Sequence, residues 1–340
     1  MPGTVDAFHF PVLFADIGGT NARFAVLEHP GAQPYYFEHI KTKDYETVAD
    51  ALATAILPQA GTPPRTLMFA VAAPIGKDRT PLTNSHWVVE PMALIERFGL
   101  AQVMLFNDFE ALALALPTLT LDDIDPIGTA AAPALDNKVV VGPGTGLGAG
   151  GLVRAGGSWV PVAGEGGHID LAPVSDRDFA IWPQIERLDG SFEGRVSAET
   201  LVCGSGLVRL YQAICRTDGL PMPHPDPAGV TAAAEANDPA AREAMELFAV
   251  HLGRTAGNLA LVFLAHGGVY LAGGIAPRIA PILKSGGFRA AFEDKVPHSA
   301  MLSTMPTGII THSRPALAGL IGYARSPGNF LLDVHDRLWG

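Results

Sequence analysis

The sequence has little cysteine and no excess of positive charge, and each shortage argues against a class of protein. Its 340 residues include two cysteines, Cys203 and Cys215, which are too few for a disulfide framework or a cysteine zinc site. Acidic residues outnumber basic ones by 34 to 23, and the net charge is −11. Because nucleic acids bind to basic surfaces, this balance argues against a nucleic-acid partner. It does not argue against a nucleotide, since backbone N–H groups and a metal ion neutralise its phosphates locally.

Long hydrophobic runs are also missing. Residues 1–11 lack the basic region and apolar core of a signal peptide. The longest apolar stretch, Leu259 to Ile275, contains His266 and two glycine pairs, so it is too short and too broken for a membrane span. We therefore expect a soluble cytoplasmic protein. With 48% hydrophobic residues, the chain is long enough for two domains with substantial cores.

A polar turn follows the first apolar run of the chain. The stretch from Leu13 to Arg23 joins that run to a carboxylate, a glycine pair and two small polar residues, and then turns apolar again. This pattern predicts two antiparallel strands joined by a tight turn whose N–H groups can approach phosphate oxygens. Asp16 stands where a divalent metal on those phosphates needs an oxygen ligand or an acceptor for its bound water. An ordinary hairpin with a polar tip explains the stretch about equally well. The candidate phosphate turn comprises Gly18, Gly19, Thr20 and Asn21.

A second copy of the pattern occurs in the middle of the chain. From Val139 to Gly148 an apolar strand again leads into a Gly-Thr turn, and a strand of small residues follows from Ala149 to Val153. Only the first copy carries an aspartate. Two such hairpins indicate a duplicated architecture that holds a nucleotide between its halves. The candidate residues of the second turn are Gly144, Thr145 and Gly146.

Strand and helix patterns alternate along the rest of the chain, which predicts an α/β protein with a mixed sheet. Residues 117–137, rich in Thr, Asp, Pro and Ala, are predicted to be a linker into the second half. Beyond the two hairpins, we expect strands at residues 35–42, 66–73, 102–106, 159–162, 269–272 and 307–311. We expect helices at residues 45–57, 91–98, 110–116, 176–187, 197–202, 205–216, 239–266 and 315–324.

Asn107 and Asp108 follow the strand predicted at residues 102–106. In open α/β sheets, ligands bind at the carboxyl ends of strands. The pair is therefore a candidate ligand site with a carboxylate beside an amide. An Asn or Asp helix N-cap before Glu110 is an equally good explanation, and the two roles are compatible.

The glycine-rich loop from Gly164 to Asp170 carries Glu165 and His168. Its open backbone projects a carboxylate and an imidazole from one short segment, which suits a polyhydroxylated ligand, because each hydroxyl offers a donor and an acceptor. A flexible surface loop with incidental charges is the alternative. A metal site is less favoured, because further Cys or His partners are missing nearby.

Three further features are individually weak. Glu199 fits a first-turn or capping-box glutamate, which is the favoured interpretation of that residue alone. The glycines of residues 204–206 and the pair Gly273 and Gly274 can bring backbone close to a flat ligand such as adenine.

Six motifs together resemble the bacterial glucokinase family, in the order in which that family has them. They are Asp16-Ile-Gly-Gly-Thr-Asn21, Asn107-Asp108-Phe109, Gly142-Pro-Gly-Thr-Gly-Leu-Gly148, Gly164-Glu-Gly-Gly-His168, Ser197-Ala-Glu199 and Ala272-Gly-Gly-Ile275. The match runs from about Leu13 to about Gly322. The resemblance implies a two-domain actin-like ATPase fold, ribonuclease H-like, with a mixed sheet in each domain and a central cleft. A cysteine-rich zinc loop after His168 is missing, so the chain looks like the glucokinase branch rather than the repressor and open-reading-frame kinase branch.

The resemblance also implies domains, partners and residue roles. Residues 1–117 and 313–340 would form a small domain and residues 118–312 a large one, and the chain would be a homodimer that uses ATP and Mg²⁺. The phosphates or their Mg²⁺ would contact Asp16, Gly18, Gly19 and Thr20. The second phosphate loop would be Gly144, Thr145 and Gly146, and Gly273 and Gly274 would flank adenosine. The sugar would be ringed by Asn107, Asp108, Glu165, His168 and Glu199, with Asp108 as base.

The chain departs from the family just before Glu199. The family usually has Gly-His-Val-Ser there, whereas this chain has Gly194-Arg195-Val196-Ser197, preceded by an extra glycine-containing stretch from Leu188. The role of Glu199 and the sugar preference near it are the implications that this departure affects.

We therefore predict the reaction ATP + hexose → ADP + hexose 6-phosphate, with glucose preferred over galactose and the product entering glycolysis. A kinase for fructose, mannose or an amino sugar is the alternative within the class, and the sequence leaves ATP, ADP and polyphosphate open as donors. A non-kinase ATPase of the same fold would not need Glu165 and His168. A sugar-responsive transcription regulator would need a DNA-binding helix pair, for which the residues before the first strand leave no room.

Overall fold

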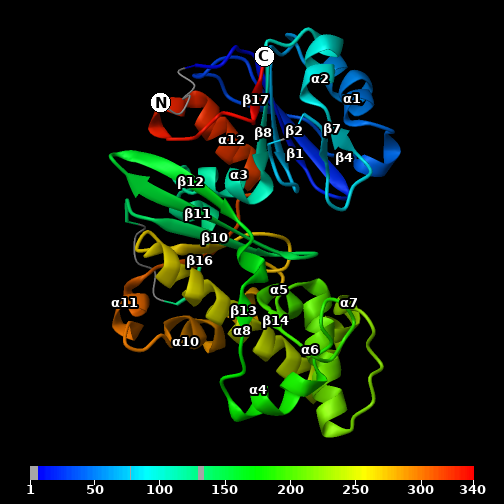
Figure 1. Ribbon diagram of the computed structural model, residues 1–340, viewed down its shortest axis with the longest axis vertical. Coiled ribbons are helices and arrows are strands. Elements are labelled where there is room, and N and C mark those ends of the chain that lie inside the picture. The colour runs from blue at the N-terminus through cyan, green and yellow to red at the C-terminus, as the bar shows by residue number, and fades with distance from the viewer. Residues whose placement is uncertain (1–6, 77, 129–133) are drawn as a thin grey trace. The chain divides into compact units, whose positions relative to one another are not determined.

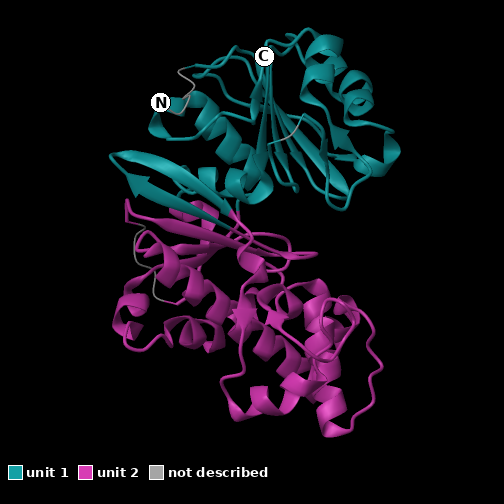
Figure 2. Cartoon of the chain, viewed as in Figure 1, with its two compact units in different colours: residues 1–120, 150–163, 312–340 teal, residues 121–149, 164–311 magenta. Residues whose placement is uncertain are grey.

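The computed structural model describes residues 7–76, 78–128 and 134–340. Within these residues, helices alternate with the strands of mixed sheets, which confirms the predicted α/β class. The chain divides into two compact units (Figure 2), of which unit 1 comprises residues 1–120, 150–163 and 312–340, and unit 2 comprises residues 121–149 and 164–311. The sequence-based domains differ from these units chiefly at residues 150–163 and stay a prediction.

Unit 1 contains a seven-stranded sheet in the order β17-β8-β5-β1-β2-β3, with β4 paired to β2 (Figure 1). Strands β1, β5 and β8 run parallel, whereas β2 is antiparallel to β1 and β17 is antiparallel to β8. All six residues of β5 are buried, as in a strand covered on both faces. The strands are β1 (Val12–Ile17), β2 (Asn21–Leu27), β3 (Tyr35–Tyr36), β4 (Ile40–Lys41), β5 (Thr66–Val71), β8 (Gln102–Asn107) and β17 (Leu338–Trp339). A separate two-stranded ribbon pairs β6 (Thr80–Pro81) with β7 (Val88–Val89).

Helices cover both faces of this sheet. Residues of α1 (Val48–Ala51) and α2 (Pro91–Phe98) share a core with Leu13, Ala15 and Ile17 of β1. Helix α12 (Pro315–Arg325) packs against α3 (Asp108–Ala115) and contacts β1, β2 and β5. Between α12 and α3 the backbones lie so close that a Cβ on Gly319 would be 2.0 Å from the Ala111 carbonyl oxygen.

The structure corrects two sequence predictions in unit 1. The strand expected at residues 35–42 is divided into the short strands β3 and β4. The helix expected at residues 45–57 begins at Val48 and continues as a π-helical turn, Leu52–Ile56, and a 3₁₀ turn, Leu57–Gln59. That last turn contains Pro58, which has no N–H for a further helical hydrogen bond.

A second sheet has six strands in the order β12-β11-β10-β15-β16-β9. Strands β10, β15 and β16 are parallel to one another, and β9 is antiparallel to β16. The strands are β9 (Ile124–Pro126), β10 (Lys138–Pro143), β11 (Leu147–Ala155), β12 (Ser158–Gly164), β15 (Val269–Leu271) and β16 (Thr307–Ile310). A short ribbon pairs β13 (Asp170–Leu171) with β14 (Val196–Ser197).

Helix α8 (Pro239–Phe263) spans 25 residues and packs against α6 (Gly204–Asp218), α7 (Pro227–Glu235) and α10 (Gly287–Glu293). The side chain of Asp238 accepts a hydrogen bond from Ala241 N at 2.8 Å and so caps the start of α8. Proline occupies the first helical position, where its restricted φ already has a helical value. The remaining helices are α4 (Asp176–Ile181), α5 (Ala198–Leu201), α9 (Ala280–Leu283) and α11 (Ser299–Thr304).

The predicted linker at residues 117–137 is partly wrong. Its residues 129–133 lie outside the described residues, but β9 pairs with β16 at Asp125 and Ile309. The proline at the end of β9 is tolerated because β9 is an edge strand. A strand that contains proline has a composition like that of a linker, which explains the wrong part of the prediction. Among the residues that the structure describes, none of the helices combines the length and the apolar character that crossing a membrane requires.

Candidate active site

The first predicted hairpin is present, and its turn is held in place by its surroundings. Gly18 N donates to Asn21 O at 3.0 Å, and Thr42 binds the turn twice, through Thr42 Oγ1 to Gly19 O at 2.8 Å and Thr42 N to Thr20 O at 3.0 Å. In the described part of the chain, the N–H groups of Gly19 and Thr20 donate to no protein acceptor. The turn therefore presents free backbone donors, which are what a phosphate group binds.

Glycine is required at residue 19 by a close approach that the sequence did not reveal. A Cβ on Gly19 would lie 2.5 Å from the carbonyl oxygen of Asn84, which itself has a positive φ of 66°. Asn84 is thus part of the surroundings of the turn. It lies 65 positions after Gly19 in the sequence, and no sequence pattern indicated the contact. Its left-handed backbone is one that asparagine adopts more readily than most residues.

Asp16 lies at the end of β1 beside Arg23 of β2. The two are register partners, and Arg23 Nη1 lies 3.5 Å from Asp16 Oδ2. Burial raises the pKa of Asp16, and the positive charge of Arg23 opposes that rise. A carboxylate in such a position gains from a nearby cation, so it fits the role of a ligand to a metal ion or to the metal's bound water.

Asn107 and Asp108 stand at the junction of β8 and α3. Asn107 Oδ1 accepts hydrogen bonds from Phe109 N at 2.9 Å and Glu110 N at 3.3 Å, so Asn107 is the helix N-cap that the sequence allowed. Asp108 is half-buried, and its Oδ1 accepts from Phe109 N at 3.0 Å. The Asp108 carboxylate is therefore partly exposed and is not packed into the core.

The register of unit 1 brings these two motifs to one edge of the sheet. Val71 of β5 pairs with Ile17 of β1 on one side and with Asn107 of β8 on the other. Adjacent strands lie about 5 Å apart, so the ends of β1 and β8 are separated by about 10 Å. Asp16, the glycine turn and the Asn107–Asp108 pair therefore share the carboxyl edge of the parallel strands, where α/β proteins bind ligands.

In unit 2, the second glycine turn joins β10 to β11 as predicted. Gly144 N donates to Gly146 O at 2.8 Å, which closes the turn, and Gly204 N donates to Gly144 O at 2.9 Å. The side chain of Thr145 is exposed at the tip. Gly273, with a φ of +85°, packs directly behind the turn, because a Cβ there would lie 2.8 Å from Pro143 O. Gly274 is exposed and next to it.

The Glu165–His168 loop packs on the same turn. Its residues Gly166–His168 form a 3₁₀ turn, and His168 N donates to Glu165 O at 3.0 Å. A Cβ on Gly167 would lie 1.8 Å from Leu147 O, so this glycine is in direct contact with the start of β11. The side chains of Glu165 and His168 are exposed. The glycines fix the loop while its two polar side chains face solvent.

Glu199 lies in the first turn of α5 and contacts the second glycine turn. Ser197 and Thr200 form the capping box of this helix, so Glu199 is not itself a cap. Glu199 Oε2 accepts a hydrogen bond from Leu147 N at 2.8 Å. All the predicted site motifs of unit 2 therefore surround one turn, at residues 143–147.

The departure from the family pattern before Glu199 has a defined structure. The loop is ordered around buried Arg187, whose Nη1 donates to Trp182 O at 3.2 Å and whose Nε donates to Gly194 O at 3.3 Å. Arg195 Nη1 lies 3.0 Å from Asp170 Oδ1 in an exposed ion pair. Backbone pairing of β13 with β14 and the Ala198 N to Ile169 O hydrogen bond of 2.8 Å hold Glu199 next to the His168 loop despite the inserted stretch.

Unit 2 also has a cavity of about 490 Å³ next to the second turn. Apolar side chains form much of its wall, and Gly204, which donates to the turn, is one of the residues that line it. Its size and apolar lining suit a flat heterocycle. The apolar residues that line it include Leu207, Met245, Phe248, Ile275 and Ile279, and its polar residues include Asp226, Glu235 and Arg278.

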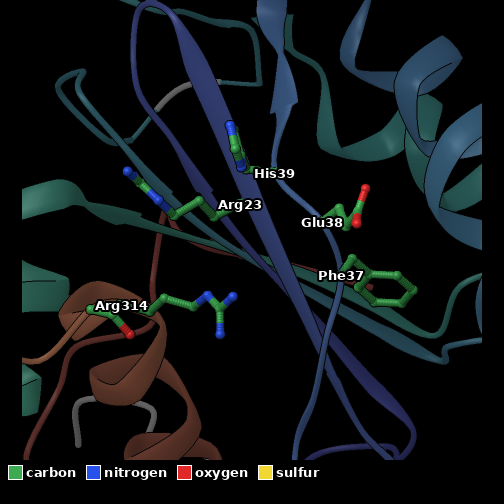
Figure 3. A pocket seen from close by; sticks show the side chains of 6 residues that line it. Arg23, Phe37, Glu38, His39 and Arg314 are labelled. Carbon is green, nitrogen blue, oxygen red and sulfur yellow. The ribbon is translucent and has the colours of Figure 1, made fainter.

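Unit 1 has a cavity of about 470 Å³ that the sequence did not predict (Figure 3). It is lined by Arg23, Phe37, Glu38, His39, Ser313 and Arg314. Arg314 stacks on the ring of Tyr36, with 4.5 Å between the guanidinium carbon and the ring centroid. Through Arg23, the cavity adjoins Asp16. No pattern in the sequence marks these residues, because they come from distant segments.

Within the described residues, no group of three or more His, Cys, Asp and Glu side chains gathers to hold a metal ion. A metal held mainly by nucleotide phosphates and water, with one carboxylate such as Asp16, fits this chain.

A family model described as glucokinase matches residues 13–327 of the chain. A glucokinase of Rhizobium johnstonii is 51% identical over 331 residues, which cover 97% of this chain and 96% of that protein. The matched range, residues 13–327, extends into both units and contains the positions of all the candidate residues named above.

Solved structures resemble the chain over similar lengths. A glucokinase from an Antarctic psychrotroph has 31% sequence identity and a TM-score of 0.84, and the match covers 94% of this chain and 100% of that one. A ROK family glucokinase from Streptomyces griseus, solved with glucose and AMPPNP, has 20% identity and a TM-score of 0.58, with 92% and 98% of the two chains covered. The second likeness supports the fold.

Proposed function

The chain belongs to the glucokinase family, and from that premise we propose that it transfers the γ-phosphoryl group of ATP to the 6-hydroxyl of glucose. The products are ADP and glucose 6-phosphate, the entry compound of glycolysis. The observation that carries the proposal is the shared edge of the first sheet, where a half-buried carboxylate, Asp108, follows β8 and a turn with free N–H donors follows β1, the two parallel strands that flank β5.

Asp108 is the proposed base. As the 6-oxygen of the sugar attacks the γ-phosphorus, its O–H bond breaks and the Asp108 carboxylate takes the proton, while the bond from the γ-phosphorus to the ADP oxygen breaks. Phosphoryl transfer passes through a loose transition state, so the chain contributes mainly by positioning and charge neutralisation. The helix N-cap at Asn107 supports this role, because it fixes the backbone that carries Asp108.

The two glycine turns are the proposed phosphate sites. The free N–H groups of Gly19 and Thr20 support this role in unit 1, and the closed turn at Gly144–Gly146 supports it in unit 2. Bound Mg²⁺ would neutralise charge on the transferred phosphoryl group, and Asp16 is the residue that would hold it, directly or through water. Gly18 and Asn21 complete the first turn.

Adenosine is proposed to lie beside Gly273 and Gly274. Its support is the cavity of about 490 Å³, whose lining includes Ile275, which follows Gly274, and Gly204, which donates to the second turn. The apolar wall suits a purine ring, and the polar residues at Asp226 and Arg278 can meet the edge of the ring or the ribose.

The hexose is proposed to contact Asn107, Asp108, Glu165, His168 and Glu199. The last three are supported by their common attachment to residues 143–147. A site that hydrogen-bonds a particular hydroxyl rejects the epimer strongly, because its polar groups then remain unpaired. Glucose is therefore favoured over galactose. We also propose a homodimer and a location in the cytoplasm, where ATP is available.

An ADP-release assay coupled to a dye, with a panel of sugars, tests this function. We expect glucose to give a kcat/KM at least tenfold above that of fructose, mannose, galactose and the amino sugars. Comparable values for glucose and galactose would contradict the proposed sugar site. ADP release that does not depend on any sugar would indicate a non-kinase ATPase, and turnover with ADP or polyphosphate in place of ATP would correct the donor.

A further inference from the structure

Glu199 is in direct contact with the second glycine turn. Its Oε2 accepts the Leu147 N–H hydrogen bond of 2.8 Å, and a Cβ on Gly146 would lie 2.4 Å from the same oxygen. Its other oxygen, Oε1, has no hydrogen-bond partner among the residues that the structure describes. The side chain is half-buried, and Oε1 is not among the fully buried, unpartnered polar atoms of the described residues, so it is accessible while Oε2 is engaged.

The segment that carries Glu199 holds the turn at both ends. Leu147, just after the turn, binds the Glu199 carboxylate, and Gly144, at its start, accepts from Gly204 N at 2.9 Å. Glu199 itself is fixed, because the capping box of α5 and the Ala198 N to Ile169 O hydrogen bond hold its backbone. The turn therefore takes its shape partly from a carboxylate that lies 52 residues away in sequence.

We propose that Glu199 is shared between the hexose site and the nucleotide site. Its Oε2 positions the turn at residues 144–146 for the nucleotide phosphates, and its Oε1 accepts a hydrogen bond from a hexose hydroxyl. This inference rests on the proposed function and deepens it: Glu199 is a positioning residue for the nucleotide as well as a ligand of the sugar.

A shared carboxylate makes the two substrates cooperative. A hexose bound to Oε1 restricts the rotamers of Glu199 and so orders the turn before the nucleotide arrives. Conversely, a nucleotide that orders the turn fixes Glu199 for the hexose, and the two effects are equal by linkage. Without the carboxylate, the Leu147 N–H loses its acceptor and the turn loses this hydrogen bond.

Nucleotide binding in the absence of sugar tests this role. Calorimetric titrations with AMPPNP compare the wild type with Glu199→Ala and Glu199→Gln. We expect Glu199→Ala to bind AMPPNP about tenfold more weakly and to lose the enhancement by glucose. Glu199→Gln keeps a carbonyl oxygen for Leu147 N–H, so we expect AMPPNP affinity within about twofold of wild type but weaker glucose binding.

Glu165→Ala is the matched control. Glu165 is another proposed hexose ligand, but its side chain is exposed and makes no hydrogen bond to the turn within the described residues. Its loss should weaken glucose binding and leave AMPPNP binding without sugar unchanged. Thermal melts of each variant identify any that fail to fold, and Glu199→Gln keeps the test decisive if Glu199→Ala does.

The outcomes separate this inference from the proposed function. If Glu199→Ala, folded, binds AMPPNP as Glu165→Ala does, or if Glu199→Gln loses AMPPNP affinity despite its carbonyl oxygen, the shared role is wrong, while the glucose kinase activity of the wild type stands. A wild type that releases no ADP with glucose would overturn the proposed function instead.

Discussion

Gly167→Ala tests whether the Glu165–His168 loop must lie directly against the second glycine turn. The added Cβ would lie 1.8 Å from Leu147 O and 2.9 Å from Leu147 C, both backbone atoms that no rotamer change can move. A carbon and a carbonyl oxygen need about 3.3 Å between them, so one of the two segments must shift by about 1.5 Å. A misplacement of about 1 Å can cost about 10²-fold in rate. We expect kcat/KM for glucose to fall by about 10²-fold, which corresponds to about 3 kcal/mol.

Gly164→Ala is the control for this substitution. Gly164 begins the same loop, but a Cβ there meets no heavy atom within 4 Å. We expect it to keep wild-type kcat/KM and melting temperature, whereas Gly167→Ala lowers both. Steady-state kinetics with glucose and thermal melts measure the difference. If Gly167→Ala keeps kcat/KM within threefold of the control, the loop does not depend on its contact with Leu147 and the reasoning fails.

Two buried charge sites give further predictions. Glu110 is buried, and both of its carboxylate oxygens lie 2.7 Å from Arg337 Nη1. Arg337→Ala leaves that carboxylate buried without its cation, so we expect a loss of about 3–5 kcal/mol in the free energy of unfolding, measured by urea titration, and a partial recovery in Arg337→Ala with Glu110→Gln. An unchanged urea midpoint in Arg337→Ala would contradict this. Burial lowers the pKa of His251, which lies beside Asp178, Arg254 and Trp182, to about 4. Between about pH 6.5 and pH 4, His251 is therefore protonated in the unfolded chain but neutral in the folded chain. The free energy of unfolding has its full value above about pH 6.5 and falls by up to about 3 kcal/mol as the pH drops towards 4. Urea midpoints at several pH values should fall less steeply for His251→Gln, and parallel curves would show that another group is responsible.

Local sequence patterns predicted both hairpin turns, because a glycine turn between apolar strands is specified within about ten residues. They also gave an Asn or Asp helix cap as one of two explanations for Asn107 and Asp108, and Asn107 is the cap, which needs only the residue and the helix after it. Helix α7 was missed, since its Ala-rich sequence, Pro227–Glu235, lacks a strong apolar period. Strand β17 was missed because two residues, Leu338 and Trp339, become a strand only through pairing with β8.

The contacts that shape the site depend on distant segments. The Glu199 hydrogen bond to Leu147, the packing of Gly167 on the same residue and the approach of Asn84 to Gly19 all join parts of the chain far apart in sequence. Each is set by how the segments fold together, and single-sequence periodicity carries no information about it. For Glu199, the sequence alone favoured a local helix role, whereas the structure adds a contact that reaches across unit 2.

Turnover of Asp108→Asn tests the central claim most directly. Asparagine has the same shape and keeps an oxygen that can accept the Phe109 N–H hydrogen bond, so the start of α3 should remain intact. It cannot take up the proton of the sugar hydroxyl. We expect kcat with glucose and ATP to fall by about 10²–10⁴-fold, with glucose affinity measured by calorimetry within a few-fold of wild type. A variant that folds, binds glucose and turns over at nearly the wild-type rate would remove Asp108 from the mechanism.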